Sequence, residues 1–232
     1  MKRKTRVLIV EDEAAIREGL QDVFAYHGYD VDSAADGEEG LRKAITGRHD
    51  LVLLDVMLPH LDGFRICERI RERDREIPII MLTARSADED IIQGLRLGAD
   101  DYVSKPFSVT QLVLRAQAVL RRAGGTDASP RTITLGGDLC IDVANLSATR
   151  GEHSIVFTRR EMDLLAYLAA NHDRAVPREE LLHKVWGHAR GADLETRTVD
   201  IHVAKLRRKI EPGGEPRFLL TVRGAGYRLA LQ

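Results

Sequence analysis

The chain has 232 residues, of which 44% are hydrophobic and 31% charged, and its formal net charge is -1. These values are ordinary for a globular protein, and no apolar run approaches the roughly 20 residues of a membrane span. The cysteines, Cys67 and Cys140, form neither a metal-binding pair nor a disulfide framework, so we expect no membrane partner and a reducing, cytoplasmic location.

Five short apolar runs alternate with five helical patterns in the first half. The apolar runs are 7–10, 31–35, 51–54, 77–82 and 102–103, and the helical stripes run over 16–24, 41–45, 64–70, 91–97 and 112–120. Gly28, Gly47 and Gly98 follow three of these stripes, as glycines at helix C-termini do. The alternation predicts an α/β fold with a doubly wound, five-stranded parallel sheet.

Polar side chains stand where the strands of this predicted sheet end. Glu11 and Asp12 follow the first strand, Asp55 ends the third, and Thr83 and Lys105 follow the fourth and fifth. Because ligands of open α/β sheets bind at the carboxyl ends of the strands, we expect these side chains to converge. Each close pair of carboxylates repels by roughly 3–4 kcal/mol at an effective dielectric constant of about 20, and a divalent cation such as Mg²⁺ relieves that repulsion.

Such a site suits phosphoryl transfer, which needs positioning and charge neutralisation more than covalent chemistry from the protein. Asp55 is the preferred acceptor, because the pair at Glu11 and Asp12 is better placed to hold a metal. Taken singly, each residue has an ordinary structural explanation: Asp55 as a turn residue, Thr83 as a helix cap and Lys105 as a surface lysine. Only their joint occurrence favours a site.

Five motifs within residues 6–122 fit one known pattern. They are Val10–Glu13, Leu54–Pro59 with Gly63 following, Leu82–Arg85, Gly98–Tyr102 and Lys105–Phe107. Together they resemble the receiver domain of two-component response regulators, which has a flavodoxin-like fold. The resemblance implies that Asp55 accepts a phosphoryl group from a histidine kinase.

The resemblance also implies roles for the residues around Asp55. The ligands of Mg²⁺ or Mn²⁺ would be Glu11, Asp12, Asp55 and the backbone carbonyl of Met57. Residues that contact the phosphoryl group or take part in the switch would be Thr83, Ala84, Tyr102, Lys105 and Pro106. Tyr102 would turn inward as Thr83 moves toward the phosphate, although alone it reads as an edge-strand aromatic. The Lys105-Pro106 peptide bond is expected to be cis.

Two other functions compete with this interpretation. Haloacid-dehalogenase-like phosphatases also use an aspartate after a buried strand, but they need an acid two residues later, where this chain has Met57. We therefore expect no enzyme, and at most self-directed phosphotransfer and autodephosphorylation. The second rival dimerises and binds DNA without phosphorylation, and the complete set of site residues argues against it.

The resemblance places the output of the receiver on the fourth helix, fifth strand and fifth helix, which form a two-fold dimer upon phosphorylation. The residues expected on this dimer face are Ile91, Asp100, Asp101, Gln111, Arg115 and Arg122. Ile91 and Gln111 replace the usual base and acid of one charge pair. Since exposed pairs each contribute little, we expect a dimer with fewer salt bridges and more apolar contact through Ile91.

Residues 124–130 are turn-rich and unpatterned, and we predict a flexible linker there between a receiver domain at 1–123 and a second domain at 131–232. Residues 1–123 carry 19 basic and 22 acidic side chains, whereas residues 131–232 carry 16 and 13. A basic second domain suits an anionic partner, although this small excess is weak support by itself.

The second domain begins with short strands over 133–135, 139–142, 147–150 and 154–157. A capping box at Thr158 and Glu161 opens a helix, Pro177 opens another that ends before Trp186, and a third spans 196–210. A hairpin over 218–229, with Arg223 and two glycines at its turn, closes the chain. This order predicts an α+β domain.

The third helix has a basic outer face. Its core stripe is Val199, Val203, Leu206 and Ile210, and its opposite side carries Arg197, Ile201, Lys205 and Arg208 with Arg207 and Lys209 flanking. A basic helix beside a basic-tipped hairpin suits the grooves of double-stranded DNA. A solvated charged helix and an interaction-only module are the alternatives.

Four stretches of the second domain extend the resemblance. They are Phe157–Glu161, Arg178–Leu182 with Val185–Gly187, Arg197–Val203 with Leu206–Lys209, and Thr221–Arg228. They are similar to the winged-helix effector domain of the OmpR/PhoB family, which implies a transcription factor that binds tandem half-sites of double-stranded DNA. The loop from Gly187 to Leu194 would face RNA polymerase.

The resemblance assigns DNA contacts by position. Arg197, His202, Arg207 and Thr221 would hold phosphates, Thr198, Ile201 and Lys205 would face bases, Arg223 would enter the minor groove, and Arg208 lies on the same basic side. We expect Lys205→Ala to change base discrimination by about 1–3 kcal/mol, and Arg207→Ala to weaken binding to all sequences alike.

Overall fold

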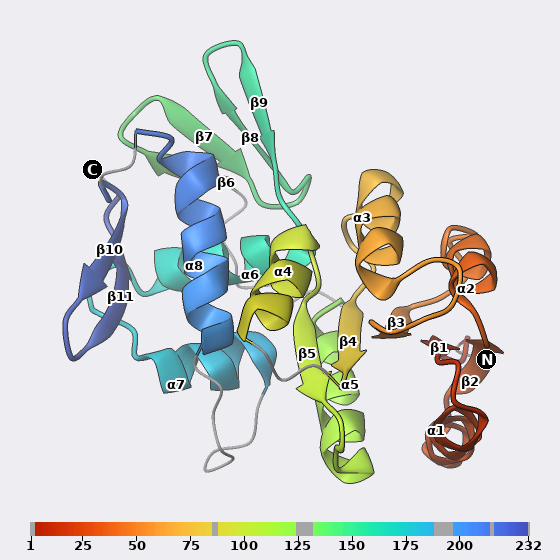
Figure 1. The fold of residues 1–232 in the computed structure, drawn as a ribbon. Coiled ribbons are helices and arrows are strands. Elements are labelled where there is room, and N and C mark those ends of the chain that lie inside the picture. Colours follow the sequence, from red (N-terminus) through yellow and green to blue (C-terminus); the bar gives the residue numbers. More distant parts are fainter. Residues whose placement is uncertain (1–2, 85–87, 124–131, 188–196, 214–215, 232) are drawn as a thin grey trace. The chain divides into compact units, whose positions relative to one another are not determined.

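The computed structural model describes residues 3–84, 88–123, 132–187, 197–213 and 216–231 (Figure 1). The chain divides into two compact units, Met1–Ala123 and Gly124–Gln232, and each is described by itself. The predicted linker, residues 124–130, lies outside the described residues. In the described part of the chain, no helix is long and apolar enough to cross a membrane.

The first unit is the predicted doubly wound sheet, with five parallel strands in the order β2-β1-β3-β4-β5. The strands are β1 (Arg6–Val10), β2 (Asp30–Ala34), β3 (Leu51–Asp55), β4 (Ile79–Thr83) and β5 (Asp101–Ser104). The helices are α1 (Ala14–Tyr26), α2 (Gly37–Ala44), α3 (Gly63–Arg73), α4 (Asp88–Leu97) and α5 (Val109–Ala123). The chain order reverses between β1 and β3, which is where such sheets bind ligands.

The central strands of this sheet are apolar up to their last residues because helices cover both of their faces. Every residue of β3 and β4 is buried. Gly28, Gly47 and Gly98 have the positive φ angles predicted for helix-terminating glycines.

The loop between β3 and α3 is held close to the end of β3. A side chain at Gly63 would place its Cβ 2.1 Å from the carbonyl oxygen of Asp55, so only glycine permits this approach. His60 has a φ of 66°, and the amide of Leu61 donates to the carbonyl of Pro59 at 2.8 Å across it. This tight turn strains a residue that carries a Cβ.

The second unit has the α+β composition of a winged-helix domain. An antiparallel sheet contains β6 (Thr132–Leu135), β7 (Leu139–Asp142), β8 (Ser147–Arg150) and β9 (His153–Val156) in that order. The helices are α6 (Arg159–Ala170), α7 (Arg178–Leu181) and α8 (Arg197–Ile210), and the hairpin or wing consists of β10 (Leu219–Val222) and β11 (Gly226–Leu229). The predicted stripe Val199, Val203, Leu206 and Ile210 lies in its core.

In the second unit, the start of α6 agrees with the sequence prediction, and the helix that begins at α7 differs from it. The predicted capping box is present: the amide of Glu161 donates to Thr158 Oγ1 at 3.3 Å, and the amide of Thr158 donates to Glu161 Oε2 at 2.9 Å. The second predicted helix is α-helical only over α7 and continues as a π-helix, η1 (Leu182–Trp186). A hydrophobic stripe does not distinguish these two hydrogen-bond patterns over so few residues.

Candidate phosphoacceptor site and nucleic-acid interface

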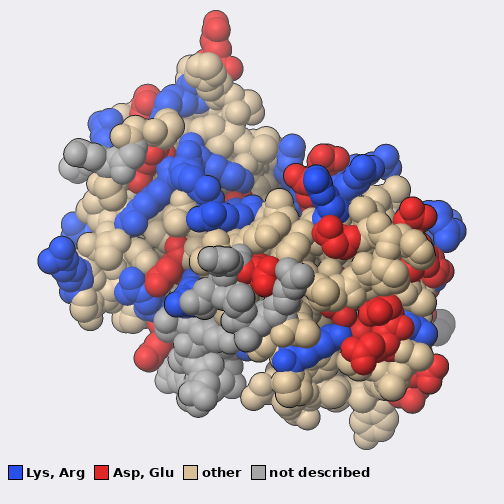
Figure 2. Space-filling view, in the orientation of Figure 1, with Lys and Arg blue, Asp and Glu red and all other residues tan. Residues whose placement is uncertain are grey.

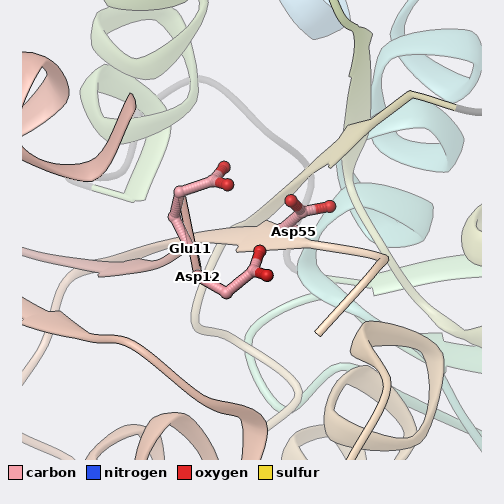
Figure 3. A group of neighbouring side chains, drawn as sticks. All are labelled: Glu11, Asp12 and Asp55. Carbon is pink, nitrogen blue, oxygen red and sulfur yellow. The ribbon is translucent and has the colours of Figure 1, made fainter. Parts of the chain in front are cut away.

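Three carboxylates meet at the carboxyl ends of β1 and β3 (Figure 3). Each of Glu11, Asp12 and Asp55 offers a carboxylate oxygen, and these oxygens all lie within 4.8 Å of one another. Glu11 and Asp55 are buried, and Asp12 is exposed. The parallel register brings the ends of the two strands together, because Val10 pairs with Leu54, the residue before Asp55.

Lys105 joins these acids from the end of β5. Its Nζ lies 2.6 Å from Asp55 Oδ2 and 2.8 Å from Glu11 Oε2. Its amide donates to the carbonyl of Thr83 at 2.7 Å, which brings the ends of β4 and β5 to the same place. The Lys105-Pro106 peptide bond is cis, as expected. The strand ends named from the sequence therefore do converge.

The electrostatics of this cluster show an excess of negative charge. Burial raises the pKa of Glu11 to about 7, with the charge of Asp55 acting in the same direction and Lys105 opposing it. Burial lowers the pKa of Lys105, but its hydrogen bonds to Asp55 and Glu11 outweigh that effect and raise the pKa above its usual value. One lysine thus serves several carboxylates.

The donor set fits a hard divalent cation. Carboxylate oxygens are the side-chain ligands that Mg²⁺ and Mn²⁺ prefer, and a cation would relieve the repulsion that burial makes costly. The amide of Met57 donates to Asp55 Oδ1 at 2.9 Å and thereby orients that carboxylate. The thioether of Met57 is half exposed and offers no general acid.

Thr83 and Tyr102 occupy the positions from which a switch is expected. Thr83 ends β4 with 2% of its surface exposed, and Tyr102 in β5 has 4% exposed. Ala84 and Pro106 are exposed at the rim of the sheet. Tyr102 is therefore buried here, whereas its predicted motion with Thr83 stays a prediction.

Asp100, one of the residues expected on the dimer face, is buried and points into the protein. Its Oδ2 accepts hydrogen bonds from Arg71 Nη2 and from the amide of Ile79, both at 2.8 Å. Arg71, in the buried side of α3, also donates from Nε to the carbonyl of Gly98 at 2.9 Å and from Nη1 to that of Ile77 at 2.7 Å. Sequence reasoning missed Arg71, although its place beside the apolar stripe of α3 was a usable signal.

The other residues expected on the dimer face differ in accessibility. Asp101 is buried and pairs with Arg115 of its own chain at 3.1 Å. Ile91, through which apolar contact was expected, is also buried, and Gln111 is exposed. The side chain of Arg122 lies outside the described part of the chain.

In the second unit, basic side chains gather over α8 (Figure 2). Arg197 and Arg208 on the helix, and Thr221 and Arg223 on the wing, are exposed as predicted. Arg207 is half-buried, and its guanidinium binds the carbonyl of Leu219 and Thr221 Oγ1. The helix and the wing therefore offer an accessible basic surface that DNA requires.

The predicted outward orientation of Lys205 is wrong. Its Nζ lies 3.3 Å from Glu161 Oε1, and Lys209 Nζ lies 2.5 Å from Oε2 of the same buried carboxylate. Burial acts to raise the pKa of Glu161, but the charges of the two lysines hold it below its usual value. Lysines four residues apart lie on one helix face, and this face is turned toward α6. The sequence identified Glu161 only as a helix cap.

His202, expected to hold a phosphate, is fully buried. Its Nδ1 lies 2.9 Å from the carbonyl oxygen of Thr198, and its ring meets that of Trp186 edge to face at 5.0 Å. Burial, together with the charge of Lys205, lowers the pKa of His202 to about 3. The ring is therefore neutral at physiological pH and unsuited to phosphate binding. Thr198 and Ile201, expected to face bases, are also buried in this structure.

Comparison with known proteins agrees with both units. Residues 7–117 match the family described as response regulator receiver domain, and residues 151–229 match the family described as transcriptional regulatory protein, C terminal. The response regulator MprA of Mycolicibacterium vanbaalenii is 40% identical over 227 residues, which are 97% of this chain and 96% of that protein. The transcriptional regulatory protein PrrA of Mycobacterium tuberculosis is 42% identical over 228 residues, which are 98% and 97%.

Two solved structures resemble the chain over its whole length. A RitR mutant matches with a TM-score of 0.75 and 32% identity, over 98% of this chain and 100% of that one. The response regulator DrrB, described as a Thermotoga maritima OmpR/PhoB homolog, matches with a TM-score of 0.53 and 30% identity, over 98% and 99%. With a receiver fold, an acidic cluster at its switch point and a DNA-binding winged-helix domain, the chain belongs to the OmpR/PhoB family of two-component response regulators, which regulate transcription.

Proposed function

We propose that Asp55 accepts a phosphoryl group from a cognate histidine kinase in the cytoplasm, with Mg²⁺ or Mn²⁺ held by Glu11, Asp12, Asp55 and the backbone carbonyl of Met57. The observation that carries this proposal is the position of Lys105 Nζ, 2.6 Å from Asp55 and 2.8 Å from Glu11. A cation fixed at the acceptor stabilises the charge of a transferring phosphoryl group. The metal, when bound, adds the remaining positive charge.

In this proposal, Thr83, Ala84 and Lys105 contact the phosphoryl oxygens. Tyr102 and Pro106 belong to the switch that responds to phosphorylation. The new group carries about -1.5 to -2 charges, which must bias an element with two arrangements. Thr83 and Tyr102 lie on adjacent paired strands, β4 and β5, in which Tyr102 pairs with Met81 and Thr83 with Ser104. No carboxylate at position 57 hastens hydrolysis, so we assign at most self-directed phosphotransfer and autodephosphorylation.

The output is a homodimer through α4, β5 and α5 that binds tandem half-sites of promoter DNA and contacts RNA polymerase. Gln111, Arg115 and Arg122 remain the proposed polar contributors to this dimer, and Asp101 takes part only if it exchanges its partner within the chain. On DNA, the exposed residues Arg197, Arg208, Thr221 and Arg223 are the proposed contacts. Arg207 can contact DNA only through the guanidinium nitrogens that do not bind the wing.

The test is to incubate the full chain with acetyl phosphate and Mg²⁺ and to measure its intact mass. We expect the mass of one phosphoryl group on the wild type and on the control Asp22→Asn, an exposed acid of α1, and none on Asp55→Asn. Light scattering and selection of bound fragments from a random duplex library then follow on the same samples. Phosphorylation without any gain in dimer or DNA binding would contradict the proposed output, and equal labelling of Asp55→Asn would contradict the acceptor.

A further inference from the structure

Three elements of the second unit meet at one aspartate in the first turn of α8. Asp200 Oδ1 accepts a hydrogen bond from Arg178 Nε of α7 at 2.7 Å and from the hydroxyl of Tyr227 of β11 at 2.6 Å. Arg178 Nη2 also donates to the Tyr227 hydroxyl at 3.0 Å. The triangle of Arg178, Asp200 and Tyr227 thus joins α7, α8 and the wing.

Arginines on both helices hold the ring of Tyr227. The guanidinium carbon of Arg178 lies 4.6 Å from the ring centroid, and that of Arg207 lies 5.9 Å from it. Arg207 in addition donates from Nε and Nη2 to the carbonyl of Leu219 at 2.8 and 2.6 Å, and so reaches the other strand of the wing. Such contacts are directional and fix both the distance and the tilt of the ring.

The backbone reinforces this junction. The amide of Val176 donates to the carbonyl of Tyr227 at 2.7 Å, and the amide of Tyr227 donates back at 3.0 Å. A side chain at Gly226, which has a φ of 123°, would place its Cβ 2.0 Å from the carbonyl oxygen of Val176. The base of the wing is therefore held to the segment that opens α7, and the triangle extends this hold to α8.

The charge of Asp200 argues for a role other than folding alone. Its side chain is 44% exposed at the start of a helix whose outer face carries Arg197 and Arg208. A carboxylate there repels a polyanion, and Arg178, paired with it at 2.7 Å, neutralises it. The carboxylate of Asp200 instead binds groups of its own unit, because two donors from different elements converge on the single atom Oδ1.

We propose that Arg178, Asp200 and Tyr227 are positioning residues that set the spacing between α8 and the wing, so that both fit one DNA site. The inference rests on the proposed DNA contacts of α8 and the wing. A helix in one groove and a hairpin at a neighbouring groove or backbone bind together only if their separation matches the duplex. If this spacing is lost, binding to the specific DNA sequence weakens, whereas sequence-independent electrostatic binding to DNA is unchanged.

The experiment compares Tyr227→Phe with Tyr167→Phe in the phosphorylated full chain. Both variants lose one hydroxyl that bonds a carboxylate at 2.6 Å, but the hydroxyl of Tyr167 bonds Glu180 of α7 and not Asp200 of α8. The probes are the duplex recovered by selection from a random library and a scrambled duplex of the same composition. We expect Tyr227→Phe to weaken binding of the selected duplex about five- to tenfold, on the scale of one ordinary hydrogen bond, and to leave the scrambled duplex within about twofold.

A second variant separates position from charge. Asp200→Asn keeps an acceptor oxygen but removes the charge, so we expect it to bind the scrambled duplex more tightly and the selected duplex more weakly. Equal weakening on both duplexes, or equal behaviour of Tyr227→Phe and Tyr167→Phe at matched folded fraction by Trp186 fluorescence, would overturn the proposal. A wild type that prefers no selected duplex would instead overturn the DNA-binding role, and this inference with it.

Discussion

Each unit of the protein contains a buried cluster of carboxylates and lysines, and the two clusters have opposite balances. In the receiver, Glu11 and Asp55 share Lys105, and the pKa of Glu11 is raised to about 7 by burial. In the effector unit, Glu161 has both Lys205 and Lys209, and its pKa is lowered despite burial. A surplus of carboxylates favours the binding of a cation, whereas a carboxylate whose charge is fully paired contributes to packing.

The largest effect is expected from removing the paired acid. Glu161→Gln removes the buried negative charge that faces Lys205 and Lys209, which costs about 3–5 kcal/mol of the unfolding free energy of the effector unit. Urea unfolding followed by Trp186 fluorescence measures it, because Trp186 is the single tryptophan of the chain and is fully buried in this unit. The control is Glu152→Gln, an exposed acid. Equal midpoints for the two variants would show that the pair contributes nothing.

A pH dependence should follow from His202, which lies beside the same lysine. Its pKa is lowered from 6.5 to about 3, so the unfolded chain takes up the proton first as the pH falls. Stability of the effector unit is complete above pH 6.5 and should decline by about 2 kcal/mol by pH 5. His202→Gln should remove this slope, and exposed His153→Gln should keep it. A wild type with no slope from pH 7 to 5 would refute the prediction.

The receiver cluster should respond in the opposite sense when an acid is removed. With its pKa raised from 4.5 to about 7, Glu11 contributes stability below pH 4.5 that is lost as the pH rises through 7. Without divalent cations at pH 8, Glu11→Gln should therefore stabilise the receiver by about 1–2 kcal/mol. Amide hydrogen exchange of Leu51–Asp55 measures it, and Glu38→Gln on α2 is the control. Faster exchange in Glu11→Gln would contradict the surplus of charge.

The smallest effect concerns the loop that follows the acceptor strand. His60 has a φ of 66°, and glycine adopts this conformation without strain. We expect His60→Gly to stabilise the receiver by about 0.5–1 kcal/mol. Thermal unfolding by circular dichroism is the measurement, and Tyr26→Gly, exposed within helix α1, should destabilise instead. A lower midpoint for His60→Gly would mean that the imidazole itself supports the loop.

The sequence predicted the sheet and the acidic site because both follow from short-range signals. Runs such as Leu51–Leu54 are too short for a helix and predict buried strands, and parallel strands bring Glu11, Asp55 and Lys105 to one edge. The errors arose where one residue type has two physical uses. Asp100 was assigned to the dimer face by the family resemblance and Lys205 to the outer side of its helix by the helical period, and each is instead paired inside its unit. Helical period alone does not tell which flank of α8 meets Glu161.

Arg71 has a mechanical consequence for the receiver. Its bond to the carbonyl of Gly98 and its pair with Asp100 pin the end of α4 and the start of β5 to α3. A helix that is fixed at its C-terminal end can move only by rotating about that end, here near Gly98. Any displacement of α4 is then smallest at Leu97 and greatest at Asp88, the end nearer in the chain to Thr83. We therefore expect α4 to rotate about this end, rather than translate, if the acceptor site shifts.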